Sequence, residues 1–414
     1  MIRALVLDGC INSALAVTRS LSMHGVSVTC GAESVLCKTL YSKHTSRKLV
    51  YTSPERCLSG FIRDIKKELI SLHYDAVFAV SDKTVLALSL KRNELEQMAG
   101  LAIAPHEPYM KALNKVDTIT AAQTLAIPVP KTFFPETIQD LKLIENEIFY
   151  PLVIKPRQSE YPAGDRIVSG GAPTYAANSV QLHETFRNYN SQLPLPMVQE
   201  YIPGQGRGVF ALFNKDGKCA AYFAHKRLRD IRPTGGGSSY RESAELDETL
   251  KYYTEKLLNH IHWEGVAMVE FREDKRDGSF KLMEINGRLW NSLALAVASG
   301  VDFPYLLFKL CSGDDVPPVY TYQKGLKCRW IMGDIRHIIE VFRGRPQGYT
   351  GDFPKLLPAI GNVVFDFFRE KSYYDVLSMS DPGPFAAECI AFIATPIRKK
   401  ITRLLQGKCI DGNF

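Results

Sequence analysis

Three oxygen-bearing side chains near residue 280 have the spacing of a divalent-cation site. Glu270 lies in one short apolar run, and Glu284 and Asn286 lie in the next. Two carboxylates and an amide oxygen suit a hard cation such as Mg²⁺, which takes oxygen ligands and commonly also holds nucleotide phosphates. Arg288 follows two residues later and could reach an anion bound beside the metal. These residues predict a cation site, and they leave a solvated acidic hairpin open as the alternative.

The elements that must position these residues are two short strands, 265–272 and 280–286, joined by a turn with Asp-Gly at 277–278. A loop of residues 276–278 places Glu270 directly opposite Glu284, where like charges are destabilising. Because side chains alternate between the two faces of a strand, Leu282 is predicted to lie on the same face as Glu284 and Asn286. The predicted hairpin therefore concentrates negative charge at one place.

Two lysines are candidates for phosphate contacts. Lys115 follows Asn114 within a predicted helix over 109–125, and Lys155 ends the apolar strand 151–155. A lysine at a strand end more often reaches solvent than a ligand, so Lys155 alone is weak support. The polar, glycine-containing segment 157–171 is predicted to be a mobile flap.

A cationic, glycine-rich segment runs from His225 to Glu242 and contains three consecutive glycines at 235–237. Backbone N–H groups exposed by glycines, together with fixed cations, make an anion cradle. A disordered basic surface loop is the alternative.

The first 105 residues alternate buried-type strands and helices, which predicts an open parallel sheet of the Rossmann type. The turn after the first strand, residues 8–12, lacks the GxGxxG fingerprint of dinucleotide sites. We therefore expect a substrate-side role at the strand ends instead of NAD or FAD binding.

Composition excludes several classes of function. The chain has 414 residues and a net charge of +7 from 51 basic and 44 acidic side chains, a modest excess that predicts no nucleic-acid partner. No apolar run reaches membrane-spanning length. The nine cysteines form no CxxC pair, which favours reduced thiols, and the N-terminus leads directly into a strand, so a cytoplasmic location is expected.

The C-terminal hundred residues contain fewer patterns that indicate structure or function. Residues 384–405 carry apolar residues at helical spacing, with a basic stretch, IRKKITR, at 397–403. Such a helix can lie on an anionic membrane surface, although packing on the body of the protein or on a homodimer partner is the plainer interpretation.

Taken in order, these motifs resemble the ATP-grasp superfamily over roughly residues 1–310, and within it the carboxylate–amine ligase and carbamoyl-phosphate-synthase-like branch. The resemblance rests on Lys115, Lys155-Pro156, the run 199–204 (QEYIPG), Glu270 and the run 284–288 (EINGR). It implies an α/β protein with a Rossmann-like pre-domain (1–105), a two-part ATP-grasp domain (106–195 and 196–313) and a C-terminal α+β extension (314–414). The family's Asn-Pro-Arg is Asn286-Gly287-Arg288 here, which keeps the ligand and the arginine.

The resemblance also implies roles for individual residues. ATP would be held by two lysines and an adenine-binding hinge: Lys115, Lys155, Gln199, Glu200, Tyr201, Ile202 and Gly204. Mg²⁺, or Mn²⁺ in its place, would be held by Glu270, Glu284 and Asn286. Catalytic contacts would come from Arg288, Lys226 and Arg227, and substrate contacts from His225, Arg229, Gly236 and Ser238.

The implied activity is ATP-dependent ligation. A small carboxylate, activated as an acyl phosphate, would be attacked by an amine, with an amino acid as an expected substrate and with ADP and phosphate released. Carboxylation of the carbamoyl-phosphate or biotin type and a nucleotide-binding module without catalysis remain alternatives.

Overall fold

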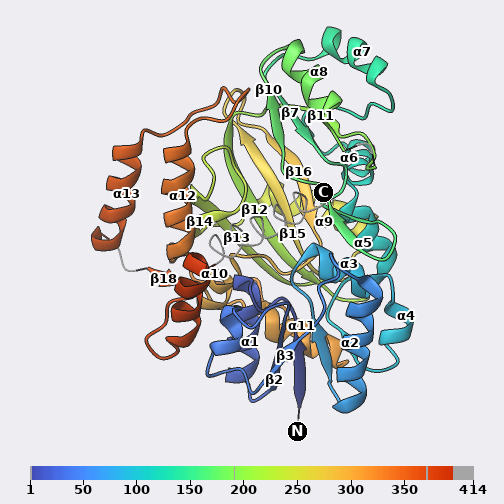
Figure 1. Cartoon of the computed structure of the whole chain (residues 1–414), viewed down its shortest axis with the longest axis vertical. Helices are drawn as coiled ribbons and strands as arrows, with labels where there is room; N and C mark the ends of the chain where they lie inside the picture. Colours follow the sequence, from blue (N-terminus) through green and yellow to red (C-terminus); the bar gives the residue numbers. More distant parts are fainter. Residues whose placement is uncertain (1, 191, 370–371, 395–414) are drawn as a thin grey trace, which may run out of the picture.

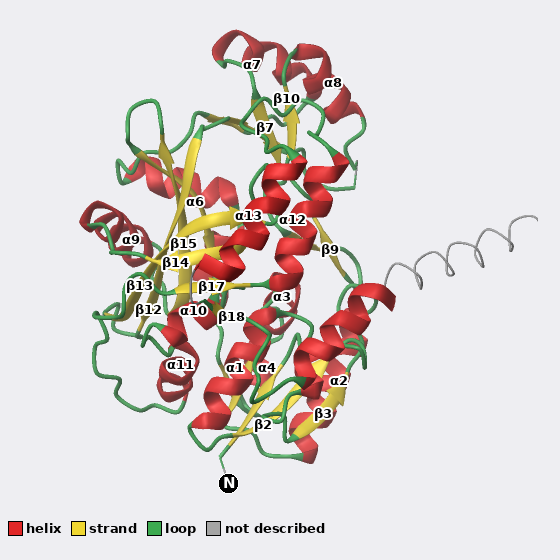
Figure 2. Ribbon diagram, turned by 90° about the vertical axis from the view of Figure 1, so that its left-hand side faces the viewer, coloured by secondary structure: helices red, strands yellow, loops and turns green. Residues whose placement is uncertain are grey.

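The computed structural model describes residues 2–190, 192–369 and 372–394. Figure 1 shows a parallel sheet near the N-terminus, a large central sheet, and a small sheet at the opposite end covered by α7 and α8. The long helices α12 and α13 lie side by side along one flank of the central sheet (Figures 1 and 2).

The N-terminal region is a five-stranded parallel sheet in the order β3-β2-β1-β4-β5. This is the Rossmann strand order without its sixth strand, so the predicted pre-domain fold is confirmed. Its elements are β1 (Arg3–Val6), α1 (Asn12–Met23), β2 (Ser27–Ala32), η1 (Lys38–Tyr41), β3 (Arg47–Val50), α2 (Leu58–Ser71), β4 (Ala76–Phe78), α3 (Asp82–Ser89), α4 (Arg92–Leu95) and β5 (Gly100–Leu101).

The next region holds a four-stranded sheet in the order β10-β7-β11-β6. The predicted helix 109–125 is two helices, because the Asn114 side chain accepts a hydrogen bond from Val116 N and starts a second helix at Lys115. The elements are α5 (His106–Leu113), α6 (Lys115–Thr124), β6 (Thr132–Phe133), η2 (Ile138–Asp140), α7 (Leu141–Glu147), β7 (Leu152–Lys155), β8 (Glu160–Pro162), β9 (Ile167–Ser169), β10 (Thr174–Ala176), α8 (Ser179–Arg187) and β11 (Met197–Glu200).

The central sheet has seven strands in the order β16-β15-β12-β13-β14-β17-β18, so the C-terminal extension adds strands to it. Most of the cationic segment 225–242 is strand, and only residues 231–237 are irregular, which rules out the alternative of a disordered loop over the whole segment. The elements are β12 (Gly204–Phe213), β13 (Cys219–Asp230), β14 (Ser238–Ser243), α9 (Glu248–His260), β15 (Gly265–Asp274), β16 (Phe280–Asn286), α10 (Leu293–Ala298), α11 (Phe303–Cys311), β17 (Lys327–Arg329), α12 (Ile331–Arg343), α13 (Leu356–Arg369) and β18 (Tyr373–Tyr374).

The β15–β16 hairpin confirms one prediction and corrects another. Glu270 pairs with Glu284, as predicted, but Phe271 pairs with Leu282, so Met283 is the extra residue of a β-bulge. The bulge reverses the alternation of side chains. Leu282 is therefore buried in the core together with Ile285, contrary to the prediction that it shares a face with Glu284.

The extension is fixed to the other domains by buried carboxylates. Asp375 pairs with Arg241 of β14, Asp381 lies 3.0 Å from Nε of Arg19 in α1, and Glu388 lies 2.6 Å from Nζ of Lys38. Residues 383–394 form a helix, whereas the predicted basic stretch 397–403 lies outside the described residues. No helix in the described part of the chain has the length and apolar character needed to cross a membrane.

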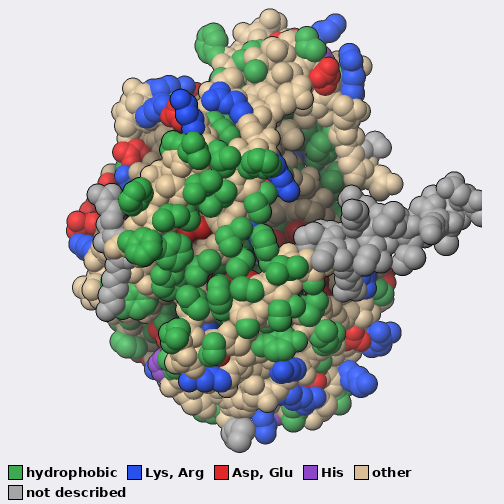
Figure 3. All heavy atoms as spheres, turned by 60° about the vertical axis from the view of Figure 1, so that its left-hand side comes forward, with side chains coloured by type: hydrophobic (Ala, Val, Ile, Leu, Met, Phe, Trp, Pro, Cys, Tyr) green, Lys and Arg blue, Asp and Glu red, His purple; other side chains and the backbone are tan. Residues whose placement is uncertain are grey.

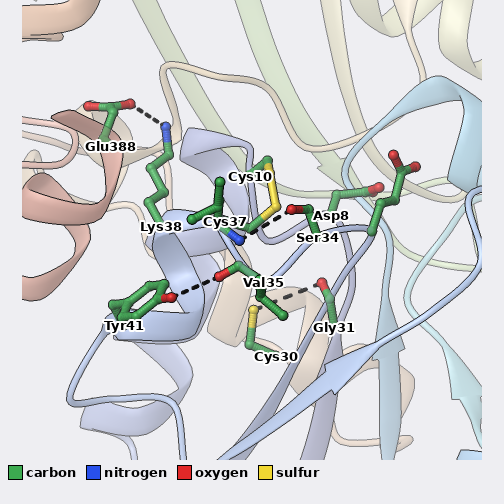
Figure 4. Close-up of a disulfide and its surroundings, with 12 residues drawn as sticks. Asp8, Cys10, Cys30, Gly31, Ser34, Val35, Cys37, Lys38, Tyr41 and Glu388 are labelled. Carbon is green, nitrogen blue, oxygen red and sulfur yellow. Dashed lines mark hydrogen bonds and ion pairs between the residues drawn. A yellow bond between two sulfur atoms is a disulfide. The ribbon is translucent and has the colours of Figure 1, made fainter. Parts of the chain in front are cut away.

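The expectation of uniformly reduced thiols was wrong for two cysteines. Cys10, in the turn before α1, forms a disulfide with Cys37, which precedes η1 (Figure 4). The Rossmann-like fold brings the two Cα atoms within 4.3 Å although 27 residues separate them in the sequence. This long-range proximity could not be read from cysteine spacing.

We predict that Asp375→Ala lowers the free energy of unfolding by about 3–5 kcal/mol, because Arg241 is then left buried without its carboxylate. Both side chains are 1% exposed. Urea-induced unfolding followed by fluorescence measures the effect. Asp352→Ala is the control, since Asp352 is fully exposed and pairs with Lys275 only at 3.5 Å. A loss below about 1 kcal/mol for Asp375→Ala would mean that the pair does not anchor the extension.

Candidate active site

A cleft of about 400 Å³ lies between the small sheet and the central sheet. Most of the predicted site residues line it, although they come from five regions of the sequence. They are Lys115, Lys155, Glu200, Tyr201, Ile202, His225, Arg227, Gly236, Ser238, Glu270, Glu284, Asn286 and Arg288. The fold therefore brings the predicted phosphate, adenine and metal residues to one place.

The two opposing glutamates each have a cationic neighbour. Glu270 Oε2 lies 2.8 Å from Nη2 of Arg227, and Glu284 Oε2 lies 3.5 Å from Nζ of Lys115. Burial by itself would raise the pKa of the Glu284 carboxyl, but Lys115 and Lys155 outweigh burial and hold that pKa below its ordinary value. The Glu284 carboxylate thus stays charged and available to a cation.

The residues present fit a magnesium ion that is completed by phosphate oxygens and water. Asn286 Nδ2 lies 3.4 Å from Glu284 Oε1, so the amide and the carboxylate share the cleft wall. No group of three or more Asp, Glu, His or Cys side chains in metal-binding proximity occurs among the described residues. Mg²⁺ is commonly held by only one or two carboxylates plus substrate phosphates, so two glutamates and an amide suffice.

The position of the Lys155 ammonium is fixed by a hydrogen bond to a neighbouring glutamine. Its Nζ donates a hydrogen bond of 2.9 Å to Oε1 of Gln199, and Nε2 of Gln199 donates to Oγ1 of Thr132. Burial lowers the pKa of the Lys155 ammonium to about 8. Gln199 is fully buried and does not line the cleft, so its observed contact is that of a support for Lys155.

The predicted adenine hinge ends strand β11, and three tyrosines meet beside it. Tyr201 of the hinge packs edge-to-face on Tyr175 of β10 and on Tyr349, with ring centroids 6.5 and 5.9 Å away. Tyr349 comes from the loop between α12 and α13, about 150 residues further along the chain. No local sequence signal links it to the hinge, and the sequence analysis missed it.

Arg288 connects the cleft to the Rossmann-like domain. Its Nε lies 2.9 Å from Oδ1 of Asp82, the first residue of α3. Asp8, at the end of β1, accepts hydrogen bonds of 2.9 Å from the backbone N–H groups of Val80 and Ser81 and so fixes the turn that carries Asp82. Asp82 was not predicted as a site residue, but its place at the carboxyl end of a parallel strand was the available signal.

The glycine segment is held against the metal residues by Arg227. Nη1 of Arg227 donates a hydrogen bond of 2.9 Å to the carbonyl of Gly236, while Nη2 faces Glu270. Gly235 and Gly236 have φ values of 107° and 117°, which side chains rarely adopt. The loop therefore requires glycines, and it forms one edge of the cleft.

His225 is the most buried of the cleft residues that can titrate. It is 3% exposed, and neither ring nitrogen has a hydrogen-bond partner among the described residues. Burial, reinforced by Arg227 and Arg241, holds the pKa of its imidazole well below the usual value. His225 thus presents a neutral ring with unused hydrogen-bonding capacity to the cleft.

Three other predicted residues do not line the cleft. Lys226 pairs with Glu242 at 2.9 Å, and Arg229 is buried against Asp334 and Asp366 of the extension. Both lie on strand β13, where alternation and bulges point them away from Arg227. Gly204 has a backbone role, because a Cβ atom there would lie 1.8 Å from the carbonyl oxygen of Glu273.

Gly287 explains a departure from the expected Asn-Pro-Arg motif. A Cβ atom at this position would lie 2.5 Å from a ring carbon of Trp263, so only glycine leaves room for the indole.

Arg272 is a further cation that lines the cleft. Alternate residues of a strand point to the same face, so the position of Arg272, two residues after Glu270 in β15, was a signal that could have identified it.

Comparison with known proteins agrees with this geometry. Residues 192–333 match the family described as "ATP-grasp in the biosynthetic pathway with Ter operon". A D-aspartate ligase of Enterococcus faecium is 22% identical over 240 residues, which cover 55% of this chain and 56% of the ligase. The matched region is thus little more than half the length of that relative.

Solved structures share the fold over most of the chain. N5-carboxyaminoimidazole synthetase from Staphylococcus aureus superposes with a TM-score of 0.59 at 14% identity, covering 79% of this chain and 80% of that one. Biotin carboxylase from Campylobacter jejuni gives 0.62 at 18% identity, covering 79% and 74%. An L-amino acid ligase from Bacillus licheniformis gives 0.58 at 16%, covering 76% and 75%. The chain thus contains a segment that matches an ATP-grasp family, and it shares its overall fold with these three structures.

Proposed function

We propose that the chain is an ATP-dependent carboxylate–amine ligase. The observation that carries the proposal is the pair Glu270 and Glu284, held opposite each other in a cleft that Lys115, Lys155 and Arg288 also line. In the proposal, the adenine lies at the hinge 200–202 and the phosphates lie between the two lysines. Glu270, Glu284 and Asn286 would hold magnesium, which would supply charge neutralisation at the phosphates.

The chemistry follows from the weak reactivity of a carboxylate. Its oxygen attacks the γ-phosphorus, the bond to the β-phosphate oxygen breaks, and ADP leaves. An amine nitrogen then attacks the activated carbonyl carbon, phosphate leaves with its carbon–oxygen bond electrons, and the nitrogen loses a proton. Lys155 and Arg288 hold negative oxygens in place during both steps, which is positioning and charge stabilisation.

An amino acid is proposed as one substrate. A relative that matches in sequence is a D-aspartate ligase. The structural neighbours, the L-amino acid ligase and the carboxylases alike, are below 20% identity and support the fold alone. Retention of both lysines, both glutamates and Arg288 in one cleft disfavours a module without catalysis. The proposal places the enzyme in the cytoplasm, where ATP is supplied.

The identifying experiment is a screen of ATP consumption against pairs of amino acids and small carboxylates, with the products detected by mass. The expected result is ADP, phosphate and a product lighter by one water than the sum of its two substrates. AMP and pyrophosphate as products would contradict the acyl-phosphate route.

We predict that Glu284→Ala lowers amine-dependent ATP hydrolysis at least about 100- to 1,000-fold, because one of two carboxylates that hold the metal is removed. Steady-state kinetics with the pair found in the screen measure the effect. Glu273→Ala is the matched control: Glu273 is an ion-paired glutamate of the same hairpin, bound to Arg207 at 2.6 Å, and it does not line the cleft. Full turnover by Glu284→Ala would remove the metal assignment.

We predict that ATP binding weakens as pH rises above 8. Burial sets the pKa of Lys155 at about 8 in the free protein, so the ammonium loses its proton, and its attraction for phosphate, above this pH. The Kd for ATP at saturating Mg²⁺ should rise roughly tenfold between about pH 7.5 and 9. Calorimetric titration across this range provides the measurement.

Two variants separate this effect from a general loss of structure. Lys155→Arg should give a nearly flat profile, because a guanidinium stays charged throughout. Lys67→Arg, at an exposed position of α2, should keep the wild-type profile. A flat wild-type profile, or an unchanged slope in Lys155→Arg, would show that Lys155 does not contact the phosphates.

A further inference from the structure

Two buried side chains in the wall of the cleft carry polar atoms that the fold does not use. They are the ring nitrogens of His225 and the indole N–H of Trp290, none of which has a hydrogen-bond partner in the part of the chain that the structure describes. Both side chains line the cleft, and they are only 3% and 2% exposed. Burial of a polar group without a partner costs free energy, so a ligand in the cleft is the partner that these atoms lack.

The unused atoms of His225 lie beside the proposed metal residues. His225 of β13 pairs with Gly208 of β12, which pairs with Glu270 of β15. Neighbouring strands are about 4.8 Å apart, so the backbone of His225 lies roughly 10 Å from that of Glu270. Side-chain atoms of Phe210 and Met268 fill the place above Gly208, where a Cβ atom would lie 3.1 and 3.2 Å from them. The floor between His225 and the metal residues is therefore apolar.

The ring of Phe210 also joins the two polar side chains. Its centroid lies 4.7 Å from that of His225 and 4.2 Å from that of Trp290, which follows Arg288 by two residues. Figure 3 shows hydrophobic side chains exposed over the flank of α12 and α13, whereas Phe210, His225 and Trp290 are at most 3% exposed. Apolar walls with a few placed polar atoms are the usual character of a small-molecule subsite.

The hydrogen-bonding capacity of the two side chains selects the kind of group that can bind there. The indole N–H of Trp290 can only donate, so its partner must be an acceptor. Burial, with Arg227 and Arg241 nearby, holds the pKa of the His225 imidazole well below its usual value, and the neutral ring supplies a second N–H donor. An ammonium group has no lone pair to accept these bonds, and the two arginines repel it. A carboxylate oxygen can accept both.

We propose that His225 and Trp290 form a subsite that binds one carboxylate oxygen of the acid substrate. The second oxygen of the same carboxylate then faces the γ-phosphorus, which it attacks in the proposed reaction. The inference rests on the proposed function, and it adds which of the two substrates lies against β13 and which atoms hold it. The role of His225 is binding and not proton transfer, because an imidazole of low basicity is a poor general base.

The test is calorimetric titration of the protein loaded with Mg²⁺ and adenylyl imidodiphosphate. The probes are amino acids, small carboxylates and the amines that remain when the carboxylate of each amino acid is removed. Acids are expected to bind, and the matching amines are not. Trp290→Phe and His225→Leu should each raise the Kd of the bound acid at least about tenfold, the effect of losing a hydrogen bond to a charged group. His225→Gln keeps a donor and should restore most of the affinity.

Stability measurements separate this role from a structural one. His225→Leu removes no hydrogen bond within the described protein, so its thermal unfolding midpoint should equal or exceed that of the wild type. Trp330→Phe is the matched control, because the Trp330 indole lies outside the cleft and its N–H donates to Oε1 of Glu388 at 3.0 Å. That variant should unfold at a lower temperature and bind the acid as the wild type does.

The outcomes distinguish the subsite from the proposed activity. Equal acid affinity in the wild type, Trp290→Phe and His225→Leu would overturn the subsite, and so would a nucleotide-loaded wild type that binds amines or binds no acid. Formation of ADP with an acid and an amine would still support the ligase in those cases. Acid binding that both variants weaken, without ADP formation by the wild type with any amine, would support the subsite and overturn the proposed activity.

Discussion

The cleft depends on two carboxylates held opposite each other against their mutual repulsion. Glu270 and Glu284 are paired across neighbouring strands, an arrangement that costs free energy unless cations compensate. Arg227 and Lys115 provide that compensation from two different elements, a strand of the same sheet and the first turn of α6. In the proposed reaction, Glu270, Glu284 and Asn286 would hold a metal ion that would supply part of this compensation, and Lys115 would then be free to contact phosphate oxygens. The need to keep charges balanced with and without nucleotide thus accounts for the crowding of cations around the hairpin.

The C-terminal extension contributes to this site as well as to stability. Its strands β17 and β18 continue the central sheet, and its buried acids pair with Arg19, Lys38 and Arg241. The loop between its two long helices returns to the small sheet, where the Tyr349 ring lies 5.0 Å from Tyr175. The extension therefore spans from the Rossmann-like domain to the proposed adenine end of the cleft, and its position constrains how far the small sheet can move.

The sequence predicted the residues that line the cleft better than it predicted the strands around them. Strand ends, a helix start and a hairpin are local signals, and they located Lys155, Lys115, Glu270 and Glu284 correctly in one cleft. The same local reasoning misplaced Leu282, because a single extra residue in β16 reverses the alternation and no residue type marks it. The resemblance grouped Arg229 with Arg227, whereas the bulges between them in β13 turn Arg229 away from the cleft.

What the sequence could not supply were contacts between distant segments. Tyr349 contacts Tyr201, and Asp82 contacts Arg288, only because the extension and the Rossmann-like domain pack beside the cleft. The disulfide between Cys10 and Cys37 arises in the same way, from a turn and a loop that the parallel sheet brings together. Such contacts depend on the tertiary arrangement. Side-chain periodicity and helix-capping motifs, by contrast, describe one helix or strand at a time.

The central claim is that a carboxylate oxygen attacks the γ-phosphorus in this cleft. Supplying the acid substrate with its carboxylate labelled by ¹⁸O, and measuring the mass of the inorganic phosphate released during ligation, tests it directly. The account predicts that each phosphate formed carries one labelled oxygen, because the acyl phosphate gives up the original carboxylate oxygen when the amine attacks. Unlabelled phosphate, with the label retained in the acid or found in AMP, would contradict it.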